Sequence, residues 1–427
     1  MTLPPDHPQR IELNNEVHAR PPEALVAPLR ISFLALWSDH GQRDQEWRGV
    51  SALAQRFGAA PPAPNANHFS ADLGPFRLKW ERHSEFSRYK FIVVGASDDP
   101  FAAPALAAAP ADWVAALPGQ VMMAAHVALV RAAEAEPDSD AIAARLFAGN
   151  VLIGARLGEG VATALTDFHI HGDGFSRWWV ADRGMTPRQA GRMVQRLLEI
   201  DTYRLMALLA LPAARALAPF LKQCEQELVQ ITAALANASE QDEPLLLDRL
   251  TRLEAEIGRR ESDHHYRFSA AAAYYELVQR RIAELREERI RGLQTFREFT
   301  ERRLAPAMNT CRMVAAHQES LSQRVAQATQ LLSTRVDITR ERQNQALLEA
   351  MNRRGELQLR LQETVEGLSV AAVTYYIVGL VGYAAKGLKA AGLGLNPDLA
   401  MGLSIPVVAL LVALGVRQIR RTVAQHR

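Results

Sequence analysis

Two long runs without a charged residue near the C-terminal end constrain the fold of this chain most. The first run, Gly367 to Ala385, has nineteen residues, and the second, Leu399 to Val416, has eighteen. Nineteen helical residues extend about 28 Å, close to the ~30 Å hydrocarbon core of a bilayer. The runs therefore predict a two-helix transmembrane hairpin over 367–416, with the lipid bilayer as partner. The alternative is a hairpin buried inside a soluble domain.

Basic residues around these runs predict the orientation of the hairpin. On the side of the hairpin that carries the rest of the chain, the segment before the first run contains Arg353, Arg354 and Arg360. On the same side, a basic tail at 417–427 contains Arg417, Arg420, Arg421 and Arg427. The connecting loop carries only Lys386 and Lys389. Because Lys and Arg gather on the cytoplasmic side of membrane proteins, we expect both termini in the cytoplasm.

Small and polar residues of the hairpin are candidates for helix packing or for lining a pore. Gly379 and Gly382 would let two membrane helices approach closely. A polar stripe through Ser369, Thr374 and Tyr375 would suit a pore, with Lys386 at its end. Two spans alone cannot enclose an aqueous path, so a pore would need several copies of the chain. A homo-oligomer is the expected state, and a monomer or dimer would favour a simple anchor.

The middle of the chain, residues 185–366, predicts long helices and a stalk. Thr186 and Pro187 suit the N-cap and first position of a helix, and 243–303 predicts a charge-rich helix or helix pair. Pro306 is expected to break the pattern, and a stalk helix is expected from Met313 into the first apolar run. Coiled-coil spacing is followed by two sets of residues: Leu321, Val325, Ala328 and Leu332, then Leu361, Val365 and Leu368.

Residues 1–184 predict an α+β domain with a mostly antiparallel sheet. Short β-rich runs alternate there with helical stretches and Pro/Ala-rich loops. The strands are expected at 31–37, 76–83, 87–95, 121–130, 150–158, 161–170 and 175–182, and the helices at DQEWRGVSALAQRF and DAIAARLF.

Composition and motifs argue against several classes of function. The formal net charge is only +2, so nucleic acid is not an expected partner. Cys224 and Cys311 stand outside any CxxC or Cys/His cluster. No GxGxxG, GxxxxGK[ST] or GxSxG motif occurs in a fitting context. We therefore predict no enzyme, and assign no catalytic residue, metal or cofactor.

Three polar clusters in the N-terminal domain are candidate ligand-binding residues. They contain His18 and Arg20, then Glu81 and His83, then His169 and His171. Histidines and carboxylates together hold metals or move protons, and His169 and His171 would share one face of a strand. The alternative is that DFHIHGDG forms a hairpin with solvated polar residues, and that Glu81 pairs with a nearby Arg.

Four sequence blocks resemble a known family. NEVHARPPEAL, WERHSEFSRYKF, DGFSRWWV and AGRMVQRLLEIDTYRLMALLALP are similar to blocks of a bacterial family of uncharacterised membrane-anchored proteins, a domain of unknown function. The resemblance covers nearly the whole chain. It implies a multi-pass protein of the bacterial inner membrane and assigns no residue a role.

The expected architecture also resembles that of the CorA family of divalent-cation transporters. That family combines a cytoplasmic α/β domain, a stalk continuous with the first span and a C-terminal hairpin. Its Gly-Met-Asn motif at the end of the first span is absent here, where GYAAKG places Lys386. A ring of ammonium groups would repel Mg²⁺. Two hypotheses are favoured, an oligomeric CorA-like channel or transporter, and a membrane-anchored structural, scaffold or sensory protein with a cytoplasmic binding domain. A third alternative is an enzyme that uses the His169/His171 or the His18 cluster.

Overall fold

The computed structural model describes residues 4–11, 13–14, 22–38, 40–64, 66–132, 138–392 and 396–424. The chain divides into two compact units. The first contains residues 1–237 and 248–328, and the second contains residues 238–247 and 329–427. One long helix, α9 (Ala305–Ala390), continues from the first unit into the second.

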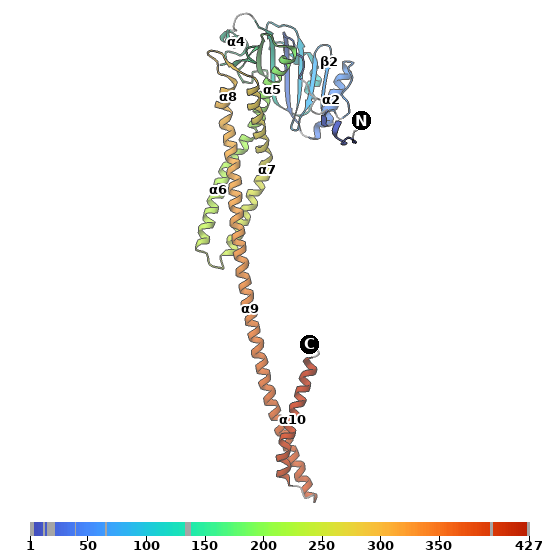
Figure 1. The fold of residues 1–427 in the computed structure, drawn as a ribbon, viewed down its shortest axis with the longest axis vertical. Helices are drawn as coiled ribbons and strands as arrows, with labels where there is room; N and C mark the ends of the chain where they lie inside the picture. Colours follow the sequence, from blue (N-terminus) through green and yellow to red (C-terminus); the bar gives the residue numbers. More distant parts are fainter. Residues whose placement is uncertain are drawn as a thin grey trace. The chain divides into compact units, whose positions relative to one another are not determined.

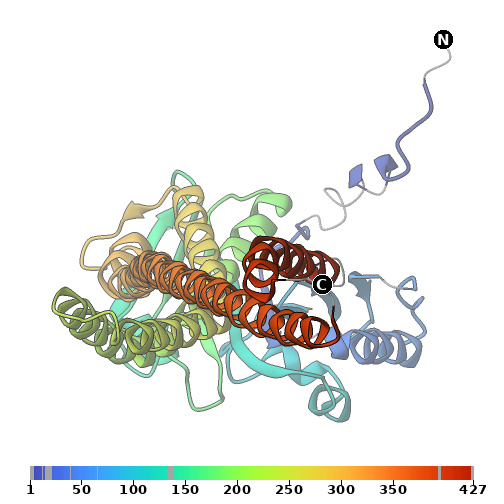
Figure 2. The same ribbon diagram turned by 90° about the horizontal axis from the view of Figure 1, so that it is seen from below.

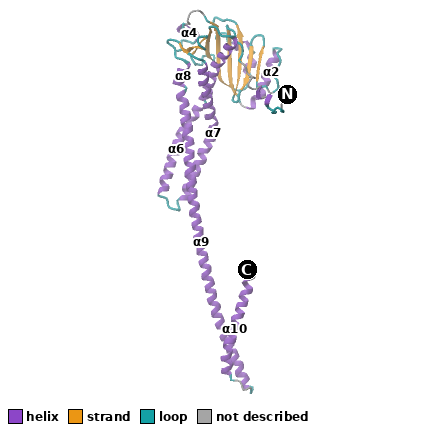
Figure 3. Ribbon diagram, viewed as in Figure 1, coloured by secondary structure: helices purple, strands orange, loops and turns teal. Residues whose placement is uncertain are grey.

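The described residues of the first unit contain a nine-stranded sheet, from which the long helices α6 (Ala210–Ala236) and α7 (Glu243–Glu284) extend to one side (Figure 3). The strand order is β2-β3-β4-β1-β5-β8-β7-β6-β9, and every neighbouring pair is antiparallel except β5 and β8. The strands are β1 (Leu29–Trp37), β2 (His68–Asp72), β3 (Arg77–Arg82), β4 (Phe86–Val94), β5 (Gln120–Arg131), β6 (Ile153–Leu157), β7 (Ala162–Thr166), β8 (Ser176–Asp182) and β9 (Glu288–Arg289).

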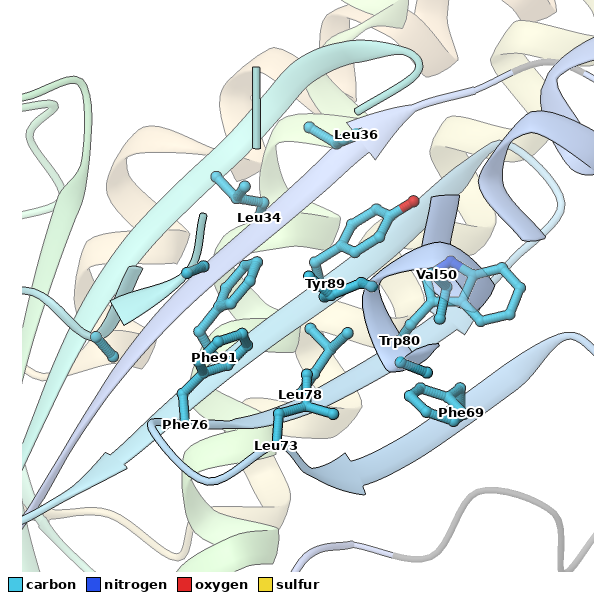
Figure 4. Packing of buried hydrophobic residues seen from close by; sticks show 14 of the residues in the cluster. Leu34, Leu36, Val50, Phe69, Leu73, Phe76, Leu78, Trp80, Tyr89 and Phe91 are labelled. Atoms are coloured by element: carbon cyan, nitrogen blue, oxygen red, sulfur yellow. The ribbon is translucent and has the colours of Figure 1, made fainter. Parts of the chain in front are cut away.

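One face of the sheet packs an apolar core against helix α2 (Arg43–Arg56) (Figure 4). Leu78 and Trp80 of β3 and Tyr89 and Phe91 of β4 are fully buried there. Successive side chains of a strand point to opposite faces. The residues that alternate with them, including Lys79, Arg88 and Lys90, therefore point to the other face, and they are buried too. Both faces of β3 and β4 are thus covered by protein.

Helix α5 (Pro187–Leu208) covers this second face. Its N-terminus has a capping box, in which Thr186 and Gln189 each bond the other's backbone N–H. Leu197, Leu198 and Met206 are buried. The remaining helical elements of the described chain are η1 (His40–Gln42), η2 (Ala105–Ala108), α3 (Ala111–Ala115), α4 (Ser139–Leu146), α6 (Ala210–Ala236), α7 (Glu243–Glu284), α8 (Phe296–Arg303) and α10 (Pro397–Ala424).

Within the first unit, α6, α7 and the beginning of α9 lie side by side (Figure 1). Arg324 of α9 donates to Glu225 of α6 over 3.0 Å. Leu321 and Val325, predicted from their heptad spacing to face a helical partner, are fully buried. In the second unit, α10 folds back beside the end of α9 (Figure 2). A Cβ added at Gly382 of α9 would lie 2.5 Å from Sδ of Met401 of α10.

The predicted fold class is confirmed in its broad form: an N-terminal α/β sheet domain is followed by a mostly helical part with long helices. One detail was wrong. Pro306 lies in the first turn of α9, where its missing N–H has no helical partner to lose, so the helix starts at Ala305 and not at Met313. The 243–303 region is a helix pair, which was one of the two predicted alternatives, and β9 lies between its helices α7 and α8. Neither β9 nor β2 was predicted.

Candidate functional site

A cluster of charged side chains lies buried between the sheet and helices α5 and α7. Arg88 of β4 donates to Glu81 of β3 over 2.7 Å and to Glu199 of α5 over 3.2 Å. The second oxygen of Glu199 accepts from Arg281 of α7 at 2.5 Å. The chain Glu81–Arg88–Glu199–Arg281 therefore joins two strands to two helices. Buried charges are tolerated when they are paired in this way.

Electrostatics inside this cluster favour the ionised carboxylates. Burial alone would raise the pKa of Glu81, but the positive charges of Arg88, Lys79 and Lys90 lower it to about 2. Burial likewise opposes ionisation of Glu199, and Arg88, Gln195 and Arg281 together hold its pKa below the usual value. Both carboxylates thus remain charged near neutral pH and act as hydrogen-bond acceptors.

Two buried lysines stand beside the ion-pair chain. Lys79 and Lys90 are directly opposite each other on β3 and β4, and each is only 6% exposed. Lys79 pairs with Glu81 at 3.1 Å. Burial and the neighbouring Lys79 lower the pKa of Lys90 to about 8. Because like charges directly opposite each other destabilise a sheet, Glu81 is needed to hold this pair in place.

All four sequence blocks quoted above contribute to the same covered face. From the second and fourth blocks come Glu81, Arg88 and Glu199, and from the third comes Ser176, which donates to Asp201 of α5 over 2.9 Å. From the first comes Glu23, which accepts a hydrogen bond from Ser70 at 2.7 Å. The backbone oxygen of Glu23 would lie 1.6 Å from a Cβ at position 191, so only glycine fits there.

His169 and His171 lie in the loop between β7 and β8, so the prediction that they share a strand face is wrong. His171 Nε2 is 2.9 Å from Asp167 Oδ2, and its side chain is 7% exposed, whereas that of His169 is 67% exposed. Asp167 also accepts from Asn150 at 2.8 Å and from the backbone N–H of His169. Asp167 thus stabilises the loop. The described residues contain no group of three side chains suited to hold a metal.

The remaining candidate ligand residues are not brought together. Glu81 belongs to the buried ion-pair cluster, and His83 stacks on Phe86 with ring centroids 4.7 Å apart. His18 and Arg20 lie outside the described residues. The sequence reasoning missed Glu199 and Arg281. The burial of Glu199 could have been predicted, since it is a charged residue inside the otherwise apolar LLEI stretch. The sequence around Arg281, by contrast, does not distinguish it from the other charged residues of its helix.

The hairpin of α9 and α10 packs through small and medium-sized residues. The residues of the first apolar run that are partly or fully buried are Val370, Thr374, Val378, Gly379, Val381, Gly382 and Ala385. Tyr375 points outward and is 78% exposed, and Ser369 donates to the backbone oxygen of Val365. Consecutive helical residues are about 100° apart around the axis, so the three predicted polar residues do not form one stripe. Lys386 is exposed at the end of the helix.

Gly382→Leu is expected to destabilise this hairpin by about 1–3 kcal/mol, because overpacking forces neighbours to move. The new side chain would collide with Met401. The matched control is Gly379→Leu, since no heavy atom lies within 4 Å of a Cβ at that position. The measurement is the thermal unfolding of the detergent-solubilised chain. Equal losses from both variants would contradict close packing at Gly382.

Three helical segments of the described chain are long and apolar enough to cross a membrane, judged by length and composition. They are Pro187–Ala236, Phe296–Ala390 and Pro397–Ile419. The protein itself buries 33% of the apolar window of the first, 11% of the second and none of the third. The first segment contains α5, whose apolar face covers the sheet. The second and third contain the two runs of the predicted hairpin.

A family model described as "Protein of unknown function (DUF3422)" matches residues 5–423. This match confirms the resemblance expected from the four sequence blocks. No curated protein matches the chain. No solved structure matches it either, and the likeness to the CorA family remains a prediction.

Proposed function

We propose that this chain, which belongs to the DUF3422 family, is an integral protein of the bacterial inner membrane. In this proposal, the ends of α9 and α10 cross the bilayer as a hairpin and anchor an α/β domain on the cytoplasmic side. The anchored domain serves as a scaffold, structural or sensory unit.

The observation that carries this proposal is the exposure of large apolar side chains on both helices of the hairpin. Leu380 and Leu403 are 67% and 68% exposed, although soluble proteins rarely expose contiguous apolar surface of this extent. The inward residues are small or medium-sized, and the large exposed ones are Leu, Val, Ile and Tyr. This is the distribution expected when lipid surrounds a helical hairpin.

Topology mapping tests the orientation. A cysteine placed at Asn396, in the connecting loop, is expected to react with a membrane-impermeant thiol reagent added to the outside of intact spheroplasts. A cysteine at Gln418, beyond the second run, is expected to react only after lysis, because Arg417 and its basic neighbours favour the cytoplasmic side. The parent chain is a suitable background, since Cys224 and Cys311 are buried. The reverse labelling pattern would invert the proposed topology.

The anchoring function is better supported than ion transport. One copy supplies only two spans, and Ser369, Thr374 and Tyr375 point in different directions around α9. No carboxylate occurs within either uncharged run, and Lys386 would repel cations at the end of the first. A channel would therefore need several copies around a central hole. Imaging of the detergent-solubilised particle distinguishes the two functions, since a ring of copies with a central hole through the membrane-spanning part would favour transport.

A further inference from the structure

The part of α9 that precedes the first apolar run lacks any covering element among the described residues. Every residue from Glu341 to Val365 is exposed, including Leu361 at 67% and Val365 at 57%. A single helix in water is marginally stable, and most helices in proteins depend on the packing of an apolar face. Such a stretch therefore points to a partner.

The apolar residues of this stretch follow a heptad. Seven positions with alternating spacings of four and three residues define a membrane-proximal seam: Leu347, Met351, Arg354, Gln358, Leu361, Val365 and Leu368. Five of these seven are large and apolar. Alternating spacings of four and three place side chains in a row that suits knobs-into-holes packing between supercoiled helices.

The charges of this stretch are kept away from the seam. Between Leu347 and Leu368 the charged residues are Glu349, Arg353, Arg354, Glu356, Arg360, Glu363 and Glu366. Only Arg354 lies in the seam. The six positions that flank the seam on either side are all uncharged, namely Leu348, Ala350, Gly355, Leu357, Gln362 and Thr364. The uncharged face is therefore broader than the seam alone, as expected of a helix that buries a wide stripe of its surface against its partners.

We propose that the membrane-proximal seam packs against the same seam in other copies of this chain, forming a parallel homo-oligomeric coiled coil. This inference rests on the proposed membrane anchoring. Since α9 continues without a break into the first apolar run, the bilayer would hold all copies parallel and at one depth. Identical positions would then meet, so that Leu361 faces Leu361 and the charged outer positions remain in water. Arg354 and Gln358 form a polar layer that disfavours shifted registers.

Cysteine cross-linking of the full chain in native membranes tests the seam. Single substitutions are placed in the seam (Leu347→Cys, Leu361→Cys) and two residues further on, at outer positions (Glu349→Cys, Glu363→Cys). Mild oxidation is expected to give disulfide-linked dimers for the seam variants and none above the level of the parent chain for the outer variants, because disulfides need Cα atoms within about 7 Å. Equal cross-linking at all four positions, or none at the seam, overturns the proposal.

The same samples separate this inference from the proposed function. Chain recovered in the soluble fraction would refute membrane anchoring, whatever the cross-linking pattern. Chain that stays in the membrane but shows no seam cross-links would refute only the coiled coil. Partnership with a helix of a different protein would also give no homodimer, and thus counts against the proposal.

A pair of neighbouring arginines supplies a second test. Arg354→Leu replaces the one charged residue of the seam and is expected to lower the protein concentration at which the oligomer dissociates in detergent by about tenfold. Arg353→Leu, at an outer position, is expected to leave that concentration unchanged. Sedimentation over a dilution series measures both variants. A weaker oligomer for Arg354→Leu, or equal shifts for the two variants, would contradict the seam.

Discussion

Ending the chain after Glu366 is expected to move the protein completely from the membrane fraction to the soluble fraction. The deletion removes both uncharged runs, each of which is about long enough to cross the hydrocarbon core. It leaves the sheet, α5, α6, α7 and the first part of α9 intact. The measurement is ultracentrifugation of lysates after a high-salt wash, which releases proteins that are held only by charge.

A shorter deletion provides the control for this truncation. A chain ending after Arg417 keeps both runs and loses only the end of the basic tail, so it is expected to remain in the membrane fraction. If the chain ending at Glu366 still sediments with membranes after the wash, another part of the molecule also binds lipid. The apolar segment Pro187–Ala236 would then be the next region to examine, since it is the one apolar segment of the described chain that the truncation after Glu366 leaves whole.

Arg88→Ala is expected to destabilise the first unit by about 3–5 kcal/mol, the cost of breaking a buried ion pair by removing one partner. Glu81 and Glu199 would remain buried and would each lose a guanidinium at 2.7 and 3.2 Å. The control is Arg286→Ala, whose pair with Glu159 is exposed and is expected to contribute less than about 1 kcal/mol. Tryptophan fluorescence during chemical unfolding of the detergent-solubilised chain reports on both, because Trp80 and Trp178 are fully buried in this unit. A loss no larger than that of the control would show that the cluster is not held by Arg88.

The same variant is expected to change the response to acid. In the folded wild type the pKa of Glu81 is about 2, against 4.5 for an unperturbed glutamate. The folded state therefore binds fewer protons than the unfolded state between these values, so this contribution is complete above pH 4.5 and is lost as the pH falls toward 2. Without Arg88 the pKa of Glu81 rises, and the pH dependence of stability in this window is expected to weaken.

Periodicity and turn chemistry allowed much of the fold to be predicted. Seven of the strands were located from their short β-rich runs, and Thr186 with Pro187 marked the start of α5 at the correct residue. Strand β9 has only two residues, Glu288 and Arg289. Its place depends on pairing with β6, and such a long-range contact leaves no trace in a local pattern.

The buried charged cluster was harder to predict for a different reason. Apolar and charged residues alternate along β3 and β4, a pattern that predicts one buried and one solvated face. The charged residues Lys79, Glu81, Arg88 and Lys90 are of types that normally remain in water. Only the docking of α5 and α7, far along the chain, makes that face interior. The sequence suggested that Glu81 would pair with a nearby Arg, and Arg88 is that partner. Neither Glu199 nor Arg281 is near it in sequence.

The double-sided burial of β4 has a consequence for how this unit can be altered. A strand with one solvent-exposed face tolerates replacement at every second position. In β4, by contrast, every residue along Phe86–Ile92 is buried. Replacing Phe91 by a smaller residue would leave a cavity, whereas replacing Arg88 by a neutral residue would leave the buried carboxylates of Glu81 and Glu199 without this counter-ion. The sheet also cannot be excised from its helices as a minimal domain, because without them Arg88 would lose Glu199 and the second face of β3 and β4 would no longer be covered. The strands must therefore fold together with α5 and α7 as one cooperative unit.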